Sequence, residues 1–426
     1  MDKKNILVFP CGSEIGLEIY KSLKYSRFIN LYGGNSVDDH GKFIFENYVN
    51  GIPFVDEPNF IPCIRQIVEE YKIDAIFPTM DSVITKLGKN QDLLNCIVIG
   101  SSIWTTAICL SKKRTYEVLG KLVKVPRIYT NLDEIEEFPV FMKPEIGYGS
   151  RGACIIKDKS QAEIHLKEFP NSIILEYLPG KEYTVDCFTN RKRELLFVGP
   201  RLRKRIRTGI SVNTISIEKD IKRFQEIANQ INRILELRGA WFFQVKENWQ
   251  GELVLLEVAC RLGGSSGLYR SKGINFALLS IFDSFVDEVK ILENNFLIEM
   301  DRALDSKYII GLNFDKAYID YDDCLVINDK LNVQLISLIY QFINEKIKII
   351  ILTKYQQGDI YRMLRLHRIE SLFDEVICIN KSDNKFRYID PNKSIFIDDS
   401  FKERKEVFDM LKIPVFAPDA VECLIK

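Results

Sequence analysis

The sequence predicts a multidomain chain that combines α/β and α+β architecture. At 426 residues it exceeds one ordinary domain, so two or three domains are expected. Both ends of the chain place short apolar runs before turns and helices, as parallel α/β units do. The middle of the chain instead carries β-rich runs joined by tight turns, which is typical of hairpins.

Composition and charge argue against several classes of protein. The chain is 46% hydrophobic and 28% charged, and it has no apolar run long enough to span a bilayer. Lysine plus arginine and aspartate plus glutamate both number 59, so we expect neither nucleic acid nor a membrane as a partner. Ten cysteines without a Cys-x-x-Cys pair, and an N-terminal apolar segment too short for a signal peptide, predict a cytoplasmic protein with reduced thiols.

The first third is predicted to form a parallel α/β unit. Residues 5–9 favour a buried strand, a glycine-containing turn follows over 10–16, and residues 17–23 favour an amphipathic helix. The turn has two glycines and no evident ribose carboxylate, so we interpret it as a tight turn or as part of a substrate pocket. Thr79 and Asp81 follow a later strand, at the edge where open α/β sheets bind ligands.

Residues 138–152 predict a phosphate-binding loop. An apolar strand ends at Lys143, and Gly147, Gly149 and Gly152 then let the backbone turn and approach a ligand closely. Lys143 and Arg151 bring positive charge to the same place. We therefore expect a triphosphate site, and the alternative is a hairpin turn with two incidental cations.

Two neighbouring segments favour the same ligand. Ser111 is expected to cap a helix, and Lys112 would lie in its first turn, where the helix dipole disfavours cations unless an anion binds. A solvated charge cluster is the alternative for Lys112. At the turn formed by Pro179 and Gly180, we expect an adenine to meet the backbone near residues 177–178, with Glu182 accepting from ribose hydroxyls.

Three features of the middle third indicate phosphate and metal chemistry. The basic run 201–207 is interpreted as contacting an anionic substrate or a phosphate, because the chain as a whole is neutral. Residues 240–265 predict a hairpin in which Gln244 faces one side and Glu257 lies in a nearly all-apolar strand. A buried carboxylate needs a partner, and Mg²⁺ supplies one. Arg261 follows in a further anion-binding turn.

From about residue 1 to 295 these motifs together resemble the ATP-grasp superfamily, in the branch that resembles carbamoyl-phosphate synthase large chains. The matching pieces are the Ser-Lys-Lys-Arg-Thr-Tyr helix, Lys143-Pro before Gly-Tyr-Gly-Ser-Arg-Gly, Leu-Glu-Tyr-Leu-Pro-Gly-Lys-Glu-Tyr, Gln244, and Glu257 through Gly264. The resemblance implies a Rossmann-like pre-ATP-grasp domain over 1–108 and an ATP-grasp domain over 109–298, with a lid subdomain at about 120–190.

The resemblance also implies roles for single residues. Those that would contact ATP are Lys112, Lys143, Gly147, Gly149, Ser150, Glu176, Tyr177, Leu178 and Glu182. Gln244 and Glu257 would face Mg²⁺, and Arg261 would face the γ-phosphate or an acyl-phosphate. One position departs from the pattern, because Ala259 stands where such families usually have Asn. This leaves the second metal, and full catalytic competence, as open questions.

The last third contains a second set of acidic motifs. Asp320, Asp322 and Asp323 follow an apolar strand and would repel one another without a cation. Asp320 and Asp322 would point the same way and could flank one Mg²⁺. Further along lie Thr353, a lysine pair at 381 and 385, and an Asp-Asp pair: Asp398 and Asp399. Acidic turns on an ordinary α/β domain are the alternative interpretation.

This order resembles the haloacid dehalogenase-like (HAD-like) phosphatases over about 305–426, which implies a C-terminal HAD-like Rossmannoid domain. By resemblance, Asp320 is the nucleophile and Asp322 the general acid–base, and both also contact Mg²⁺. Thr353 and Lys385 would hold the phosphoryl group, with Lys381 as the fallback for Lys385. Asp398 and Asp399 would bind Mg²⁺. Cys324 replaces a usual Thr or Val.

The combination predicts an ATP- and Mg²⁺-dependent carboxylate–amine ligase fused to a phosphatase. Its partners would be a small carboxylate, a small amine and a phosphate ester, and a homodimer is one option for assembly. The phosphatase segment leaves no room for a large cap, which favours an extended phosphate or a substrate delivered by the neighbouring domain. The alternatives are a non-catalytic nucleotide sensor with the phosphatase as the only enzyme, and phosphoryl transfer to a hydroxyl.

Overall fold

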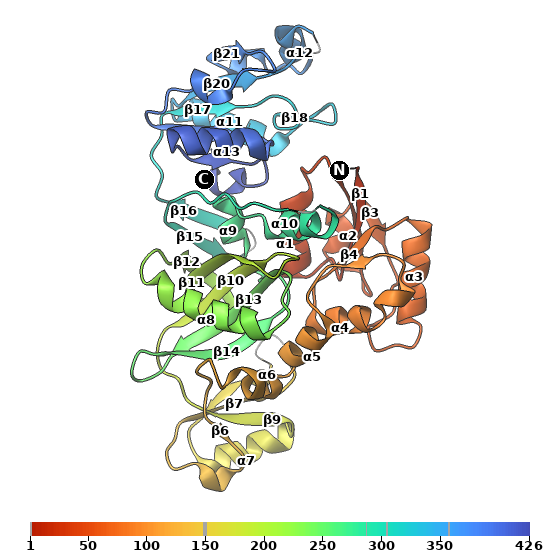
Figure 1. Ribbon diagram of the computed structural model, residues 1–426, viewed down its shortest axis with the longest axis vertical. Helices are drawn as coiled ribbons and strands as arrows, with labels where there is room; N and C mark the ends of the chain where they lie inside the picture. The colour runs from red at the N-terminus through yellow and green to blue at the C-terminus, as the bar shows by residue number, and fades with distance from the viewer. Residues whose placement is uncertain (1, 148–150, 287, 304–305, 357) are drawn as a thin grey trace.

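The computed structural model describes residues 2–147, 151–286, 288–303, 306–356 and 358–426. The chain is elongated, with a C-terminal parallel sheet at one end and a small antiparallel sheet at the other (Figure 1). An N-terminal parallel sheet and a seven-stranded antiparallel sheet lie side by side between them, and helix α1 contacts helix α10 where they meet.

The N-terminal sheet is parallel throughout, in the order β3-β2-β1-β4-β5. Its strands are β1 (Lys4–Phe9), β2 (Ile29–Gly34), β3 (Asn47–Val49), β4 (Ala75–Pro78) and β5 (Ile97–Val98). Its helices are α1 (Glu14–Leu23), α2 (Gly41–Ile44), α3 (Phe60–Glu70) and α4 (Asp81–Lys89). The central strand is apolar on both faces, because helices cover both sides of the sheet. Ser13 caps α1 by accepting from the Gly16 amide, so the helix begins at Glu14, inside the stretch 10–16 that was expected to be a turn.

The middle sheet is antiparallel, in the order β14-β13-β10-β11-β12-β15-β16. Its strands are β10 (Glu182–Thr189), β11 (Leu195–Arg207), β12 (Ile210–Ser216), β13 (Gly239–Glu247), β14 (Leu253–Ala259), β15 (Ile298–Arg302) and β16 (Ser306–Ile310). Its helices are α5 (Ile103–Leu110), α6 (Lys112–Leu119), α8 (Ile221–Ile234), α9 (Gly267–Ser271) and α10 (Phe276–Phe285). Helix α8 buries Phe224, Ala228 and Ile231 against one face of this sheet.

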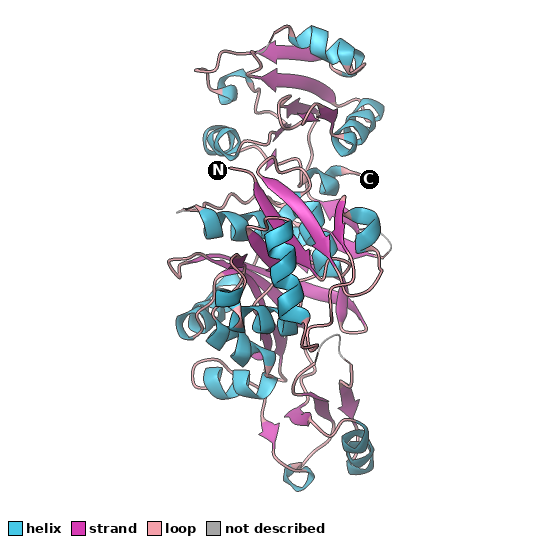
Figure 2. Ribbon diagram, turned by 90° about the vertical axis from the view of Figure 1, so that its right-hand side faces the viewer, coloured by secondary structure: helices cyan, strands magenta, loops and turns pink. Residues whose placement is uncertain are grey.

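The small sheet has the order β6-β9-β7-β8 and carries helix α7 (Lys159–Glu168). Its strands are β6 (Ile128–Tyr129), β7 (Val140–Pro144), β8 (Cys154–Ile156) and β9 (Ser172–Glu176). These elements lie inside the span of about 120–190 expected for a lid. Figure 2 shows them as a separate lobe below the middle sheet.

The C-terminal sheet is again parallel, in the order β21-β20-β17-β22-β23. Its strands are β17 (Lys316–Ile319), β20 (Lys348–Thr353), β21 (Glu375–Cys378), β22 (Ser394–Ile397) and β23 (Val415–Phe416). Helices α11 (Val333–Asn344), α12 (Ile360–Leu366) and α13 (Phe401–Leu411) surround it, and a short hairpin precedes α11: β18 (Val326–Ile327) and β19 (Lys330–Leu331). Single 3₁₀ turns complete the chain at Gln91–Leu93, Leu132–Glu134, Glu370–Leu372, Lys385–Tyr388 and Val421–Leu424.

One predicted boundary differs from the structure. Residues from 305 onward were expected to belong to the C-terminal domain, but β16 pairs antiparallel with β15 at the edge of the middle sheet. The strand completes that sheet because its backbone is hydrogen-bonded there, and Tyr308 and Ile310 pack on the apolar core. The C-terminal sheet therefore begins only at β17.

The three larger sheets share one apolar core. Buried side chains from β1, α9, β17, α11 and the last 3₁₀ turn belong to a single continuous cluster. At its edge the buried guanidinium of Arg270 on α9 pairs with Glu18 on α1 and with Glu422 near the C-terminus, at 2.6 Å each. This ion-pair cluster ties together segments of all three sheets. In the described part of the chain, no helix is long and apolar enough to cross a membrane.

Candidate functional sites

The β13–β14 hairpin places two oxygen-bearing side chains side by side. The turn of residues 248–251 has the positive φ of +76° at Gly251, and a register shift between Gln244 and Val245 then brings Gln244 directly opposite Glu257. Directly paired residues point to the same face of a sheet. Among the described residues, the half-buried Glu257 carboxylate has no hydrogen-bond or ion-pair partner, so its charge is available to a ligand.

Lys143, at the end of β7, faces this carboxylate from the small sheet. Its ammonium is buried and donates to the Tyr116 hydroxyl at 3.0 Å and to the Leu256 carbonyl at 3.1 Å. Burial lowers the pKa of Lys143 to about 8, although the negative charges of Glu257 and Glu182 oppose the shift. The lysine is thus held in a dry position next to the carboxylate predicted to bind a metal.

Helix α6 brings the second predicted lysine to the same loop. Ser111 caps the helix by accepting from the Arg114 amide, and its hydroxyl also donates to the Glu145 carboxylate. Lys112 donates to the carbonyls of Glu145, at 3.4 Å, and Gly147, at 3.2 Å. Burial lowers the pKa of Lys112. Lys112 and the first glycine of the predicted phosphate loop therefore meet, whereas Gly149 and Ser150 lie outside the described residues.

The residues predicted to hold adenine and ribose lie on the strand that leaves the small sheet and on β10. Glu176 ends β9, and its carboxylate accepts from the Arg127 amide at 3.0 Å. Tyr177 is half-buried and Leu178 is buried, so the segment that joins the two sheets is anchored at Leu178. Glu182 begins β10, directly across from Lys246 on β13.

Arg203 on β11 is a site residue that the sequence analysis did not single out. Its guanidinium forms an ion pair with Glu182 and donates to the Gln244 side-chain oxygen at 2.7 Å. It is buried, and its Nε has no hydrogen-bond partner among the described residues. The basic run 201–207 was a usable signal for it, but a register shift between Arg203 and Arg205 means that alternation along the strand could not tell which arginine faces the site.

The basic run 201–207 is mostly paired within the protein. Arg201 forms a buried ion pair with Asp186 at 2.6 Å, and Lys204 and Arg205 pair with carboxylates on β15. The run therefore does not form a free basic surface, and only Arg203 points toward the predicted ribose and metal residues.

Arg261 connects the hairpin to the N-terminal sheet. Its Nε donates to the Asp81 carboxylate at 3.0 Å, and its guanidinium lies over the Phe242 ring. Asp81 begins α4 just past the carboxyl end of β4, the edge at which a ligand was expected. Thr79 lies there too and donates to the Pro10 carbonyl at 2.7 Å. Ala259, where the resemblance calls for Asn, is buried at the end of β14 and offers no metal ligand.

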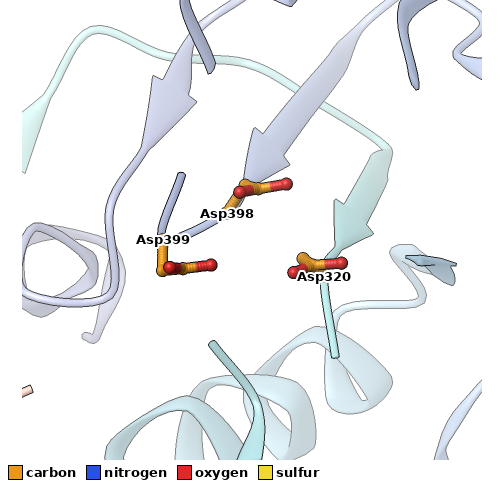
Figure 3. Close-up of side chains that lie close together, drawn as sticks. All are labelled: Asp320, Asp398 and Asp399. Carbon is orange, nitrogen blue, oxygen red and sulfur yellow. The ribbon is translucent and has the colours of Figure 1, made fainter. Parts of the chain in front are cut away.

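A second cluster lies at the carboxyl edge of the C-terminal sheet. Asp320 follows β17, and Asp398 and Asp399 follow β22, the neighbouring strand. Figure 3 shows the three side chains turned toward one another, and one oxygen of each lies within 4.8 Å of the others. The buried ammonium of Lys385 bridges Asp320 at 2.6 Å and Asp398 at 2.7 Å. The structure thus brings together four of the residues predicted from scattered motifs.

Burial and mutual repulsion govern the charges of this cluster. Burial, aided by the nearby Asp398, raises the pKa of Asp320 well above its usual range although Lys385 opposes the shift. Burial and Asp398 together raise the pKa of Asp399 to about 6. Burial disfavours the charged form of Lys385, but Asp398 and Asp320 outweigh it and raise the pKa of the lysine. Two buried carboxylates and a half-buried one share a single ammonium, so a divalent cation would favour their charged forms.

The other predicted residues of this cluster lie around it in different ways. Asp322 is half-buried beside Asp323, and burial raises its pKa. Thr353 is fully buried at the end of β20, where its hydroxyl accepts from the Tyr355 amide at 3.1 Å. Lys381 is exposed in a turn, whereas Lys385 contacts the aspartates. Arg404, which the sequence analysis missed, donates to the Asp398 carbonyl at 2.6 Å.

Comparisons with known proteins agree on the larger part of the chain. The family described as "ATP-grasp in the biosynthetic pathway with Ter operon" matches residues 168–300. The biotin carboxylase domain of the Hydrogenobacter thermophilus 2-oxoglutarate carboxylase, solved with MgADP, superposes with a TM-score of 0.60 at 15% identity, covering 71% of this chain and 75% of that one. The chain has an ATP-grasp fold.

Two further relatives share the ATP-grasp region. A D-alanine–D-alanine ligase from Fusobacterium nucleatum is 29% identical over 226 residues, which are 49% of this chain and 76% of the ligase. An L-amino acid ligase from Bacillus licheniformis superposes with a TM-score of 0.56 at 16% identity, covering 71% of this chain and 80% of that one. The assignment to a branch resembling carbamoyl-phosphate synthase, and the HAD-like assignment of the C-terminal part, stay predictions.

Proposed function

We propose that the ATP-grasp part is an ATP-dependent carboxylate–amine ligase that acts through an acyl-phosphate. The observation that carries the proposal is the Glu257 carboxylate, which has no partner in the described part of the chain and lies beside Gln244 and near the buried ammonium of Lys143. The similarity to a D-alanine–D-alanine ligase and an L-amino acid ligase supports this reaction class, because both names describe joining a carboxylate to an amine.

The residues present fit ATP and Mg²⁺. Carboxylate and amide oxygens, as on Glu257 and Gln244, are the ligands that Mg²⁺ prefers, and it commonly binds through few protein groups together with nucleotide phosphates. When bound, Mg²⁺ would neutralise charge on the phosphates and polarise the transferred one. Lys143 and Lys112 would hold phosphate oxygens, and Glu182 would accept from the ribose hydroxyls if Arg203 gives up its ion pair with it.

Arg261 has a place in the proposed reaction as well. A carboxylate oxygen of the first substrate attacks the γ-phosphorus, ADP leaves, and the amine then displaces phosphate from the acyl-phosphate. Arg261 lies at the junction of the two sheets, over Phe242 and beside Asp81. A guanidinium there would stabilise the negative oxygens of the acyl-phosphate, and Asp81 would hold it in position.

ADP release distinguishes this reaction from its alternatives. A screen with pairs of carboxylates and amines should find ADP formation that requires both partners and Mg²⁺. Dependence on a hydroxyl compound alone would instead favour phosphoryl transfer. ATP binding without turnover for any acceptor would favour the non-catalytic sensor. Ala259 supports that alternative because it stands where a metal ligand is usual.

We propose a second activity for the C-terminal part, hydrolysis of a phosphate monoester through an aspartyl-phosphate. The observation that favours it is the convergence of Asp320, Asp398 and Asp399 with Lys385 at the carboxyl edge of a parallel sheet. Three clustered carboxylates fit Mg²⁺, which would screen the charge of the phosphate when bound. The spacing of the motifs along the chain supports the same assignment.

In this reaction the protein would supply the nucleophile and the proton carrier. An Asp320 oxygen forms a bond to phosphorus, the ester oxygen leaves, and Asp322 gives that oxygen a proton. Water then attacks the aspartyl-phosphate, Asp322 takes its proton, and phosphate leaves. Mg²⁺-dependent release of phosphate from a simple ester, abolished in Asp320→Asn, tests the assignment; equal rates in the two proteins would overturn it.

A further inference from the structure

A cavity of about 570 Å³ lies between the C-terminal sheet and the rest of the chain. One wall comes from α13 and the loops beside it, and the opposite wall comes from α10 and the loop between α1 and β2. Figure 1 shows α13 and α10 on the two sides of this junction. A volume of this size lies within the range of roughly 300–1,000 Å³ that is usual for small-molecule sites.

The cavity reaches the aspartate cluster. Asp399, one of the three clustered aspartates, is part of its wall, together with Asp323 and Arg404. Arg27, from the loop after α1, forms an ion pair with Asp323 across the junction. The polar part of the wall therefore continues into the site that we propose for phosphate hydrolysis.

The wall contributed by α10 is apolar. Leu278, Leu279 and Phe282 face the cavity and stay partly exposed although they belong to the interior of the molecule. Phe28 packs edge-on against Phe282, with ring centroids 6.0 Å apart. Apolar side chains left open to an internal cavity favour a ligand whose own surface is apolar.

The C-terminal part supplies little cover for the aspartates by itself. Between Asp320 and α11, a stretch that is described throughout, the chain inserts one short hairpin with strands of two residues each. The loop between α1 and β2 and helix α10 form the other wall of the cavity, opposite Asp399. The substrate-binding surface of the C-terminal site is thus shared between segments far apart in sequence.

We propose that this cavity binds the organic group of a small phosphate monoester, one with an apolar or aromatic body, whose phosphate is hydrolysed at Asp320. The inference rests on the proposed phosphatase activity and adds the substrate class. The phosphate lies against the aspartates, and the organic group packs on the α10 wall. Substrate selection by the C-terminal site therefore depends on residues of the ATP-grasp part.

Two esters with similar leaving groups test the inference in the full chain. Benzyl phosphate and methyl phosphate both release an alkoxide of similar basicity, so a difference in kcat/KM reports binding of the organic group. We expect the wild type with Mg²⁺ to favour benzyl phosphate by roughly tenfold or more, from burial of the ring. Calorimetry with benzylphosphonate and methylphosphonate, which are not hydrolysed, should show the same preference in binding.

Variants of the α10 wall test whether the preference for benzyl phosphate comes from the cavity. Leu279→Trp fills the cavity and Phe282→Ala removes part of its apolar wall, so both should bring the benzyl-to-methyl ratio close to one. Continued hydrolysis of methyl phosphate shows that each variant is folded. Leu366→Trp on α12, where the side chain is 70% exposed, is the matched control and should keep the wild-type ratio.

The outcomes separate the two proposals. A wild-type ratio near one, or an unchanged ratio in both wall variants, overturns the cavity inference and leaves the phosphatase standing. Hydrolysis of neither ester by the wild type with Mg²⁺ overturns the phosphatase, and the inference with it. A ratio that changes equally in Leu366→Trp also overturns the inference, because the effect would not be local to the cavity.

Discussion

Lys143 shows how one buried side chain prepares a site for an anion. Its ammonium lies away from water, with a hydroxyl and a carbonyl as its acceptors, and burial lowers its pKa to about 8. The lysine is therefore poorly solvated until an anion binds. Phosphate oxygens would restore the favourable environment of the charged form, which couples nucleotide binding to protonation.

The first prediction follows from this coupling. In the free protein Lys143 loses its proton as the pH rises through about 8, and bound phosphate raises its pKa. ATP binding at pH 8 should therefore take up protons, and its affinity should fall as the pH rises further. Calorimetry in buffers of different ionisation enthalpy measures the uptake. Lys143→Met should reduce the uptake and weaken binding by roughly 1.5–3 kcal/mol; identical uptake in the variant would disprove the assignment.

The sequence could identify single residues where their partners are close along the chain. Gln244 and Glu257 were recognisable because one tight turn joins their strands, although their direct pairing depends on a register shift next to Gln244. Arg203 and Tyr116 were missed, because their roles depend on Gln244 and Lys143, which lie 41 and 27 residues away. Such contacts arise from packing of whole elements, which local pattern does not encode.

At the scale of elements, α6 is a short helix whose first turn lies at the candidate ATP site. It spans Lys112–Leu119, and both Lys112 and Tyr116 project from it toward the small sheet. Its position depends on Ser111, which caps the helix and also contacts Glu145 at the end of β7. The cap thus links helix formation to the placement of two side chains in the site.

The second prediction compares two helix caps. Ser111→Ala should cost about 1 kcal/mol of stability, which is typical for loss of a cap, and should also weaken ATP binding. Ser102→Ala removes the cap of the preceding helix α5, which carries none of the predicted site residues, and should cost similar stability without affecting ATP. Urea unfolding and calorimetry measure the two effects. Equal losses of ATP affinity in both variants would contradict the role given to α6.

The sequence predicted that most strands exist, but it did not predict which strands pair with one another. The runs before Asp320 and Asp398 were recognisable strands, and so was the hairpin that carries Glu257. Residues 306–310 have a strand pattern as well, but the pattern does not say which sheet the strand joins. Backbone pairing with β15 decides it, which is why the expected boundary at 305 was wrong.

At the scale of the whole molecule, Arg270 and its partners hold the sheets together. The guanidinium is 2% exposed and pairs with Glu18 and Glu422. Burial disfavours ionisation of Glu422, but Arg270 and Lys21 outweigh it and lower the pKa of this carboxyl from 4.5 to about 2. The stabilisation from Glu422 is therefore complete above pH 4.5 and is lost as the pH falls toward 2.

The third prediction removes this link. Arg270→Met should lower the free energy of unfolding by roughly 3–5 kcal/mol, because the largely buried Glu18 loses its ion-pair partner and Glu422 keeps only Lys21. Part of the penalty should disappear as the pH falls below 4.5 and Glu422 becomes protonated in the variant. Arg365→Met removes an exposed arginine of α12 that pairs with Asp359 and Glu370. This variant should lower the free energy of unfolding by less than about 1 kcal/mol. Urea unfolding of both variants between pH 4 and 7 measures the difference; equal losses would refute it.

We propose two separate phosphate-handling sites in one chain, an ATP site at Glu257 and an ester-hydrolysing site at Asp320. A crossed comparison of Glu257→Gln and Asp320→Asn tests it most directly, with ADP formation and ester hydrolysis measured on each full-length protein. We predict that Glu257→Gln abolishes acceptor-dependent ADP formation and keeps hydrolysis, and that Asp320→Asn does the reverse. Loss of both activities in either variant, or loss of neither, would contradict the claim.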